Sequence, residues 1–398
     1  MQTKRFAVAI VVSLACLGQA ASALPVRAAS QSSRTYASIS GGDSHTCALT
    51  SDGKAYCWGS NSKGELGDGT TTASGTSGPR KVIGGHTFRT IDVGYSGSCA
   101  ITTRGKAYCW GDNTGGENGD GTIVASGENG PQKVIGGHTF VRIAVGEMHV
   151  CALTQKGAAY CWGYNWSGML GDGTTNNSVE GGPVKVLGNH KFVTITVGED
   201  FSCGLTARGT TYCWGANGEG MLGDGTLVDS GLSGPRKVIG GHKFTYLHSG
   251  EYVTCGLTAS QRAYCWGGQN NHGALGDGTT IASGTAGPQR VIGGHRFTSI
   301  NNWGYFTCAL TPAGAAYCWG DNANGELGNG TLVSSDGAAP VKVLGNHTFK
   351  AIGPGEDHTC ALTVEGKAYC WGANGSGQLG DGTLSSAWRP KLVIDGIN

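Results

Sequence analysis

Charged residues, prolines and long apolar runs are all scarce in this chain of 398 residues. Charged side chains make up 14% of it, the formal net charge is +1, and there are 10 prolines. A chain so close to neutral has no strong field with which to attract nucleic acid or an anionic membrane, so we expect neither as a partner. No segment after residue 23 approaches the roughly 18 consecutive apolar residues of a membrane-spanning helix, so we expect no membrane span.

The N-terminus has the pattern of a secretory signal peptide. A basic start is followed by an apolar run from Phe6 to Leu17 and by a small-residue segment that ends at Ala23, as at a signal-peptidase site. We therefore expect a signal peptide over residues 1–23, a short N-terminal segment over 24–34, and a secreted or periplasmic mature protein. Cys16 also fits a lipid-attachment site, although more weakly.

Glycine, in contrast, is abundant at 73 residues, and the chain is built from repeats. The tetrad Tyr-Cys-Trp-Gly recurs at intervals of 52 residues, or 53 in one case, and begins at Tyr56, Tyr108, Tyr160, Tyr212, Tyr264, Tyr317 and Tyr369. Each repeat contains about four short β-forming runs bounded by Gly, Asn, Asp or Pro, which is the pattern of a propeller blade. We predict an all-β, seven-bladed β-propeller that occupies residues 35–398 as one domain, with four strands in each blade.

The two ends of the repeat region suggest how the ring closes. The first repeat starts late, at Tyr36, and the last ends with the segment 390–394. We therefore expect the C-terminal strand to complete a blade that the N-terminus begins, which would protect the sheet edges. The tryptophans of the tetrads are expected to fill the space between blades, because large aromatic side chains dominate core energetics.

Fourteen of the 15 cysteines form pairs whose members are ten residues apart. Because the hairpin turn lies midway, both members face each other across two antiparallel strands, within disulfide distance. We predict one disulfide per blade, each stabilising by roughly 2.5 to 3 kcal/mol. A zinc site is disfavoured because a hairpin pair supplies two of the four ligands, and we expect no metal and no cofactor. The predicted pairs are Cys47 with Cys57, Cys99 with Cys109, Cys151 with Cys161, Cys203 with Cys213, Cys255 with Cys265, Cys308 with Cys318, and Cys360 with Cys370.

The repeated segments His45-Thr-Cys-Ala-Leu-Thr, Ala55-Tyr-Cys-Trp-Gly and Leu66-Gly-Asp-Gly-Thr resemble the regulator of chromosome condensation repeat family over nearly all of the mature chain. The resemblance implies the propeller fold but not one function, since the family includes a nucleotide exchange factor for a small GTPase, an ultraviolet photoreceptor and a secreted bacterial inhibitor of β-lactamases. No repeat here exceeds its neighbours by more than one residue, so the wedge-like insertion of the exchange factor is missing.

The copies differ most in the loop between the repeated Gly and the first Cys. Repeat symmetry places these loops around one mouth of the propeller, and they combine acids with aromatic, Met and His side chains but carry no Lys or Arg. Acids with aromatic anchors are typical of a protein-binding face. The residues predicted to contact a partner are Asp43, His45, Tyr95, Glu147, Met148, His149, Glu199, Asp200, Phe201, Glu251, Tyr252, Trp303, Tyr305, Phe306, Glu356, Asp357 and His358.

An alternative for some of these residues is a structural role, in which His45 and His358 in particular only bond to neighbouring loops. Trp303 stands where most copies have Gly, so it is expected either to lean over the mouth as a contact residue or to distort its blade. Trp166 lies outside the core pattern and is expected to be exposed.

These features favour a secreted, monomeric, non-enzymatic scaffold that binds a protein partner through one mouth. No acid–base pair or nucleophile departs from the repeat, so we expect no catalytic residue. Two alternatives remain open. One is nucleotide exchange on a small GTPase, and the other is carbohydrate or cell-wall binding, in which Trp166, Trp303 and Trp388 would stack on sugar rings.

Overall fold

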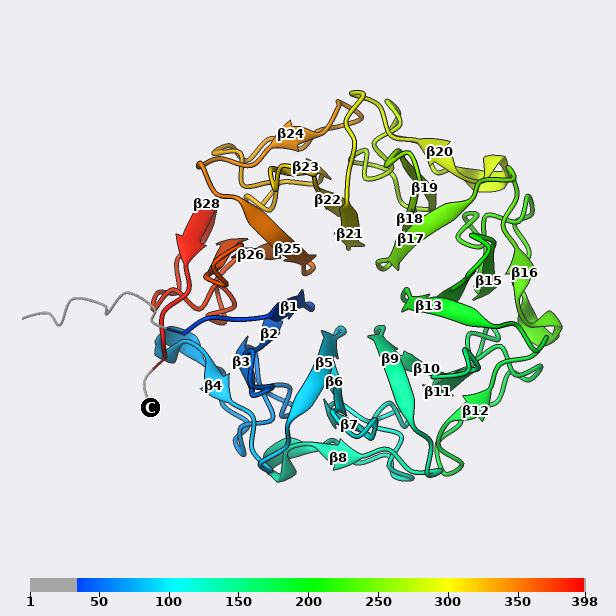
Figure 1. The fold of residues 1–398 in the computed structure, drawn as a ribbon, viewed down its shortest axis with the longest axis horizontal. Coiled ribbons are helices and arrows are strands. Elements are labelled where there is room, and N and C mark those ends of the chain that lie inside the picture. Colours follow the sequence, from blue (N-terminus) through cyan, green and yellow to red (C-terminus); the bar gives the residue numbers. More distant parts are fainter. Residues whose placement is uncertain (1–33, 397–398) are drawn as a thin grey trace, which may run out of the picture.

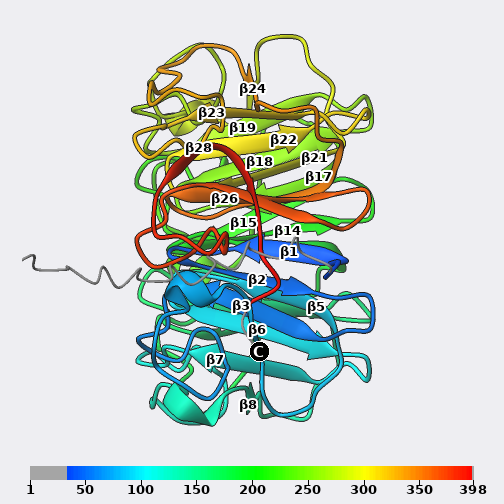
Figure 2. The ribbon, with the colours of Figure 1, turned by 90° about the vertical axis from the view of Figure 1, so that its left-hand side faces the viewer.

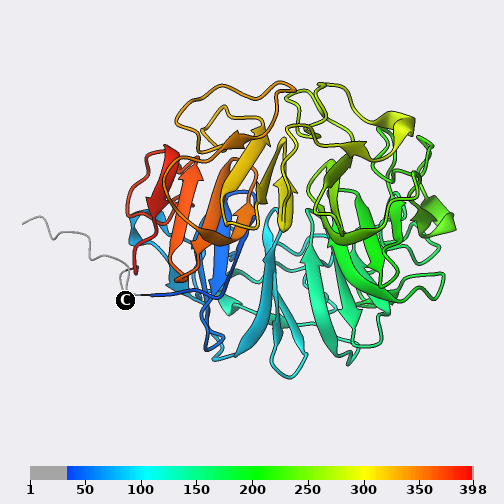
Figure 3. The same ribbon diagram turned by 45° about the horizontal axis from the view of Figure 1, so that its top comes forward.

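The computed structural model describes residues 34–396, which form seven four-stranded antiparallel sheets arranged as a ring around a central axis (Figure 1). The predicted all-β, seven-bladed propeller is therefore confirmed. The strands run along the ring axis, so the hairpins of every blade emerge at its two ends (Figures 2 and 3). The expected signal peptide, residues 24–33 and Cys16 lie outside the described residues.

Each blade takes its four strands, from the axis outward, from one continuous stretch of chain (Figure 1). The innermost strands are β1 (Ser38–Gly41), β5 (Phe88–Val93), β9 (Phe140–Val145), β13 (Phe192–Val197), β17 (Phe244–Ser249), β21 (Ser299–Trp303) and β25 (Phe349–Pro354). The second strands are β2 (His45–Leu49), β6 (Gly97–Thr102), β10 (His149–Thr154), β14 (Phe201–Thr206), β18 (Val253–Thr258), β22 (Phe306–Leu310) and β26 (His358–Thr363).

The outer half of each blade carries the tetrad and ends in a short edge. The third strands are β3 (Ala55–Gly59), β7 (Ala107–Gly111), β11 (Ala159–Gly163), β15 (Thr211–Gly215), β19 (Ala263–Gly267), β23 (Ala316–Gly320) and β27 (Ala368–Gly372). The outermost strands are β4 (Arg80–Lys81), β8 (Gln132–Lys133), β12 (Val184–Lys185), β16 (Arg236–Lys237), β20 (Gln289–Arg290), β24 (Val341–Lys342) and β28 (Ala387–Leu392). Short 3-10 helices precede four of them, at Gly75–Ser77, Gly127–Asn129, Gly231–Ser233 and Gly284–Ala286.

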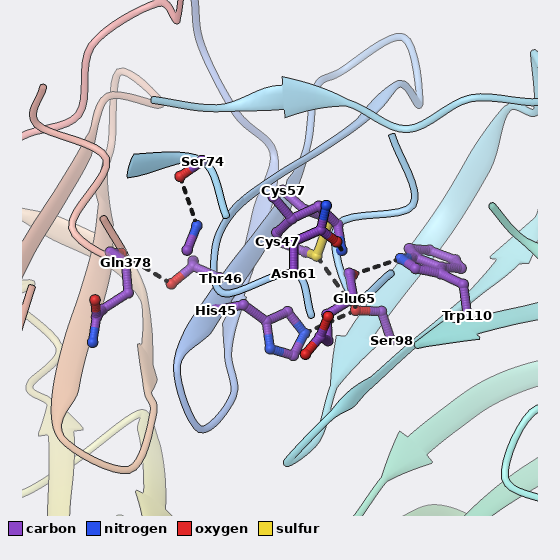
Figure 4. Close-up of a disulfide and its surroundings, with 12 residues drawn as sticks. His45, Thr46, Cys47, Cys57, Asn61, Glu65, Ser74, Ser98, Trp110 and Gln378 are labelled. Carbon is purple, nitrogen blue, oxygen red and sulfur yellow. Dashed lines mark hydrogen bonds between the residues drawn. A yellow bond between two sulfur atoms is a disulfide. The ribbon is translucent and has the colours of Figure 1, made fainter. Parts of the chain in front are cut away.

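The predicted disulfides are all formed, one in each blade. In every blade the two cysteines are direct partners across the second and third strands, as Figure 4 shows for the first blade, and their Cα atoms lie 4.1 Å apart. The equal spacing from the hairpin turn was therefore sufficient to predict both the pairing and its geometry. The bonds join Cys47 to Cys57, Cys99 to Cys109, Cys151 to Cys161, Cys203 to Cys213, Cys255 to Cys265, Cys308 to Cys318, and Cys360 to Cys370.

The tetrad tryptophans join each blade to the one before it. Trp110 is fully buried against the first blade, in a cluster with Leu49 and Leu66, and its Nε1 donates to the backbone oxygen of Glu65 at 2.8 Å (Figure 4). A Cβ at Gly67 would lie 2.8 Å from this Nε1, so only glycine lets the loop approach the indole so closely. Equivalent bonds repeat around the ring, so the tryptophans are structural, as predicted.

A buried asparagine organises the loop that receives each indole. Asn61 donates through Nδ2 to the backbone oxygens of Thr70 and Thr72 and to Asp68, and its Oδ1 accepts from the amide of Leu66. Because Asp68 also accepts from the amide and hydroxyl of Thr70, its carboxylate is engaged in holding the Gly-Asp-Gly-Thr turn.

The prediction for ring closure is wrong. Strand β28 pairs with β27 of its own repeat, and β1 belongs to a blade made wholly from the N-terminal repeat. The reason is that Tyr36 occupies the position that Phe88 has in the second repeat, so the first repeat is complete. The ring closes by packing instead: Trp58 donates to the backbone oxygen of Gln378 at 2.9 Å, and Tyr36 is buried with Leu362.

Candidate functional site

The loops between the innermost and second strands form one mouth of the propeller, and backbone bonds join four of the seven neighbouring pairs of these loops. The amide of Asp43 donates to the oxygen of Gly94, that of Glu199 to Glu251, and that of Glu356 to Gly42, at 3.1 to 3.3 Å. Each loop is also anchored by the sheet on either side. The side chains at the mouth are therefore carried on a connected frame.

The structure divides the 17 predicted residues into two groups. The first consists of partly or fully exposed side chains, which we call the mouth residues: Asp43, Tyr95, Glu147, Met148, Glu199, Asp200, Glu251, Tyr252, Tyr305, Glu356 and Asp357. The second group is buried and consists of His45, His149, Phe201, Trp303, Phe306 and His358. The buried side chains support the mouth but do not form its surface.

Five of the buried residues share one position, the first residue of a second strand. There the side chain points into the contact with a neighbouring blade. His45 Nε2 lies 2.9 Å from Ser98 Oγ, whose hydroxyl donates to the oxygen of Glu65 (Figure 4), so the imidazole is the donor to the serine. Burial lowers the pKa of His45 to about 3. The alternative of a structural role thus describes His45, although its partner lies in strand β6 and not in a loop, and His149 and His358 make matching bonds to strand residues.

Three glutamates from neighbouring blades converge at the mouth. Glu147, Glu199 and Glu251 each follow the repeated Gly of the third, fourth and fifth repeats, and one oxygen from each lies within 4.8 Å of the others. Burial, and then repulsion among these carboxylates, raises the pKa of Glu147 and of Glu251 to about 7. The mouth therefore concentrates carboxyl groups that no basic side chain of its own loops neutralises, since these loops carry no Lys or Arg.

A second acidic contact lies where the ring closes. Glu356 shares a hydrogen bond with Asp43, and this bond, together with burial and repulsion from Asp43, raises the pKa of Glu356 to about 9. Burial and the charge of Glu199 likewise raise the pKa of Asp200 to about 6. At neutral pH the mouth thus presents both charged carboxylates and a neutral carboxyl group that can donate.

Aromatic side chains stand among these acids. The rings of Tyr252 and Tyr305 lie 5.7 Å apart, and the side chain of Tyr95 is exposed. The charge of Asp43, and then burial, raises the pKa of Tyr95, so its phenol is a neutral donor at physiological pH. Trp166 is 47% exposed, as predicted, and its Nε1 donates to Asp200 Oδ1 at 3.1 Å. It extends the aromatic surface outward from the mouth.

Trp303 separates the mouth from the central channel. It lines a small pocket with Glu147, Glu199 and Glu251, and it also lines the channel behind that pocket, a cavity of about 330 Å³. Only 7% of its surface is exposed, and its Nε1 has no hydrogen-bond acceptor among residues 34–396. Trp303 is more buried than a free contact residue, and β21 runs on to include it, so that it pairs with Phe306, whereas the other innermost strands end before the repeated Gly.

The channel contains polar residues that were not among the predicted site residues. Asp92 accepts hydrogen bonds from Ser40 Oγ and from the amide of Val145, and burial raises its pKa to about 6. Tyr246 donates to Asn301 Oδ1 at 2.7 Å. The sequence contained a signal for these residues, because one position in the innermost strands differs in all seven copies, as Ser, Asp, Ala, Thr, His, Asn and Gly in chain order.

Comparison with known proteins assigns the family. Residues 128–398 match the RCC1-like domain, and residues 36–65, 88–117 and 52–101 match the regulator of chromosome condensation (RCC1) repeat. The chain belongs to the RCC1-like domain family. The resemblance inferred from the repeated motifs is therefore confirmed.

Individual relatives are similar over most of this chain. The human E3 ubiquitin-protein ligase HERC2 is 30% identical over 368 residues, which are 88% of this chain but 7% of HERC2. The ultraviolet-B receptor UVR8 of Arabidopsis thaliana is 27% identical and matches 90% of this chain and 83% of its own length. The structure of Prp20p from Saccharomyces cerevisiae superposes with a TM-score of 0.72 at 23% identity, over 90% of this chain and 87% of Prp20p. In residues 34–396 no helix is long and apolar enough to cross a membrane.

Proposed function

We propose that this RCC1-like propeller is an exported, non-enzymatic scaffold that binds a basic segment of a protein partner at its mouth. The observation that carries the proposal is the convergence of seven acids and three tyrosines on a frame whose loops contain no Lys or Arg. Lysine and arginine side chains complement this surface, because carboxylates attract their charge and tyrosine faces favour cations.

The frame supports binding because it is already ordered. Backbone bonds join four of the seven pairs of neighbouring loops at the mouth, so a partner does not have to order these loops, which reduces the entropic cost of association. Prp20p has binding properties toward Gsp1p and histones. At 23% identity the likeness to Prp20p concerns the fold, and it supports a binding role without assigning a partner.

Peptide titration calorimetry tests this function. Lys/Arg-rich peptides are compared with Glu-rich and uncharged peptides of equal length, and the basic set is expected to bind more weakly as salt rises, because exposed charges are screened. Replacing Tyr95, Tyr252 and Tyr305 together with Ala should weaken binding by at least about tenfold, since aromatic anchors carry most interface energy.

Trp388→Ala is the matched control, because Trp388 is an exposed aromatic (48%) on the outermost strand β28. Equal binding by all three peptide classes, or an unchanged affinity in the triple variant, would overturn the proposed function.

Carbohydrate binding is a second candidate that one observation favours. Trp166 is exposed, and its ring lies 5.0 Å from that of Tyr164 at an angle of 41°, so the two form an aromatic pair beside the mouth. Trp303 does not contribute to this pair, because it is buried. A glycan array probed with the native protein and with Trp166→Ala tests carbohydrate binding. This function requires that the native protein binds some glycans and that the variant no longer binds them.

A further inference from the structure

We propose that a pocket lined by Arg262, Arg290 and Arg296 binds an oxyanion, with a phosphate group as the ligand that fits best. The pocket belongs to the fifth blade, which consists of β17 to β20 (Figure 1), and its volume is about 130 Å³. Roughly 10 to 15 Å³ of space is enough for one water molecule, so a phosphate group has room there. The pocket lies toward the end of the ring opposite the mouth, and the inference does not rest on the proposed function.

The strands of the blade bring the three arginines to one pocket. Arg262 lies in the hairpin between β18 and β19, and Arg290 lies in β20, which pairs with β19. Arg296 comes from the connection to the sixth blade, where the amide of the next residue, Phe297, donates to the oxygen of Gln261 at 2.9 Å. Backbone bonds therefore hold the three positions together, which lowers the cost of ordering them around an anion.

No carboxylate neutralises these three arginines. The residues that line the pocket include no Asp or Glu, and none of the three side chains has a hydrogen bond or ion pair with another residue of the part of the chain that the structure describes. In contrast, Arg80 on β4 pairs with Asp68 at 3.0 Å, and Arg236 on β16 pairs with Asp224 at 3.3 Å. The counter-charge for the fifth-blade pocket therefore has to come from a bound anion.

The fifth copy differs from all the others at these positions. Where it has Arg262, the other copies have Lys, Ala or Thr; where it has Arg290, they have Lys or Leu; and where it has Arg296, they have Thr or Lys. A guanidinium donates two parallel hydrogen bonds to one phosphate group, whereas an ammonium acts as a point charge. Three arginines in one copy, and none at these positions in the others, thus favour recognition of an oxyanion by this blade.

The surrounding end of the ring is also basic. Besides Arg262, its hairpins between second and third strands carry Lys54, Arg104, Lys106, Lys156, Arg208 and Lys367, and their acidic residues are Asp52 and Glu365. Charge of one sign raises the local concentration of the opposite ion. The near-neutral composition of the whole chain conceals this excess, because carboxyl groups gather at the mouth.

A matching pocket in the third blade provides an internal comparison. It is lined by Lys156, Lys185 and Lys191 and has a volume of about 240 Å³. Lys185 and Lys191 hold the positions of Arg290 and Arg296 in their own copy. Because lysine lacks the planar fork of arginine, the third-blade pocket should bind phosphate more weakly than the fifth-blade pocket does.

Titration calorimetry with inorganic phosphate at constant ionic strength tests the site. We expect a Kd on the order of 10⁻⁴ M, which is within the affinity that so small a ligand can reach, and at least about tenfold weaker binding of acetate, which has fewer acceptor oxygens. Arg290→Lys introduces the residue that other copies carry and keeps the charge, and it should weaken phosphate binding at least about fivefold. The matched control is Arg208→Lys, an exposed arginine of the fourth-blade hairpin, which should leave the affinity unchanged.

Two further comparisons make the outcome decisive. Phosphate should raise the unfolding temperature of the native protein more than that of Arg290→Lys, which also shows that the variant is folded. Glycerol phosphate and phosphatidylcholine vesicles with or without phosphatidic acid distinguish a free phosphate ester from a lipid headgroup, and binding of either that Arg290→Lys weakens supports the site.

Three results would overturn this site. The first is no phosphate binding up to about 10 mM, which is far above the expected Kd. The second is unchanged phosphate binding by Arg290→Lys. The third is a loss of phosphate affinity in Lys185→Gln as large as that in Arg290→Gln, because binding would then reflect diffuse attraction to the basic end of the ring.

Discussion

The tetrad tryptophans and the mouth acids both recur around the ring, but the tryptophans are buried and the mouth acids are partly exposed. All seven tryptophans are fully buried, and each donates to a backbone oxygen of the neighbouring blade. The residues after the repeated Gly are at least partly exposed in every copy except that of Gly304, and they are Asp, Tyr, Glu or Gly. The tetrad tryptophans are thus identical across the repeats and buried between blades, whereas variation occurs both at the exposed mouth residues and at buried positions such as those of His45 and Phe201.

The boundary between these two regions runs through single loops. In the third repeat Glu147 faces the mouth, whereas His149, two residues later, is buried and lies 2.7 Å from Ser202 Oγ. The reason is that His149 is the first residue of β10, and its side chain lies in the contact with the next blade. Position within the pleat, and not residue type, decides which loop residues are available for binding.

The largest predicted effect is that of a tetrad tryptophan. Trp214→Ala should destabilise the protein by about 3 to 5 kcal/mol, because it leaves a cavity and removes the bond to the oxygen of Met169. Tyr95→Ala should change stability by less than about 0.5 kcal/mol, as exposed substitutions usually do. Guanidinium unfolding under oxidising conditions measures both. Comparable losses for the two variants would show that the mouth is part of the structural core.

The second-largest predicted effect on stability is the loss of a disulfide. Replacing Cys203 and Cys213 together with Ala should cost roughly 2.5 to 3 kcal/mol, the contribution expected from closing an 11-residue loop. The sulfurs are also fully buried between the fourth and fifth blades, so some packing is lost as well. The unfolding midpoint in guanidinium, with and without reductant, measures the effect. A variant as stable as the oxidised native protein would show that this bridge is redundant with blade packing.

Repetition explains how much of this molecule could be predicted from its sequence. The blades, the disulfides and the core role of Trp110 follow from a fixed period combined with the alternation of strands. Ring closure was mispredicted because Tyr36 was not recognised as the counterpart of Phe88. The burial of His149 depends on where a strand begins within a loop, which the repeat pattern leaves open. The convergence of the mouth glutamates depends on the angle between blades, which no spacing along the chain records.

His149 offers a sharper test of the boundary within one loop. His149→Ala should destabilise by about 2 kcal/mol, since it leaves a small cavity and removes the hydrogen bond to Ser202. Glu147→Ala, in the same loop, should be neutral or slightly stabilising, because it relieves repulsion from Glu199. Chemical unfolding of the two variants at neutral pH is the measurement. If Glu147→Ala were less stable than His149→Ala, Glu147 and not His149 would be the structural residue of this loop.

The smallest effect concerns the carboxyl pair at the mouth and depends on pH. The pKa of Glu356 is raised from 4.5 to about 9 by its bond to Asp43 and by burial, so the folded protein holds this proton more tightly than the unfolded chain does. The stability that this proton contributes is complete below about pH 4.5 and is lost as the pH rises toward 9. Glu356→Gln remains neutral and can still donate to Asp43, so it should match the native protein at pH 5.

At pH 9 the same variant should be more stable than the native protein by on the order of 1 kcal/mol, a value kept small because solvent screens this partly exposed pair. Unfolding midpoints at pH 5, 7 and 9 measure the difference, and Glu128→Gln, an exposed glutamate on a 3-10 helix, is the control. A constant offset between Glu356→Gln and the native protein at all three values would mean that the pair does not share a proton. An offset that grows as the pH rises would show instead that the proton shared by Glu356 and Asp43 stabilises the folded ring.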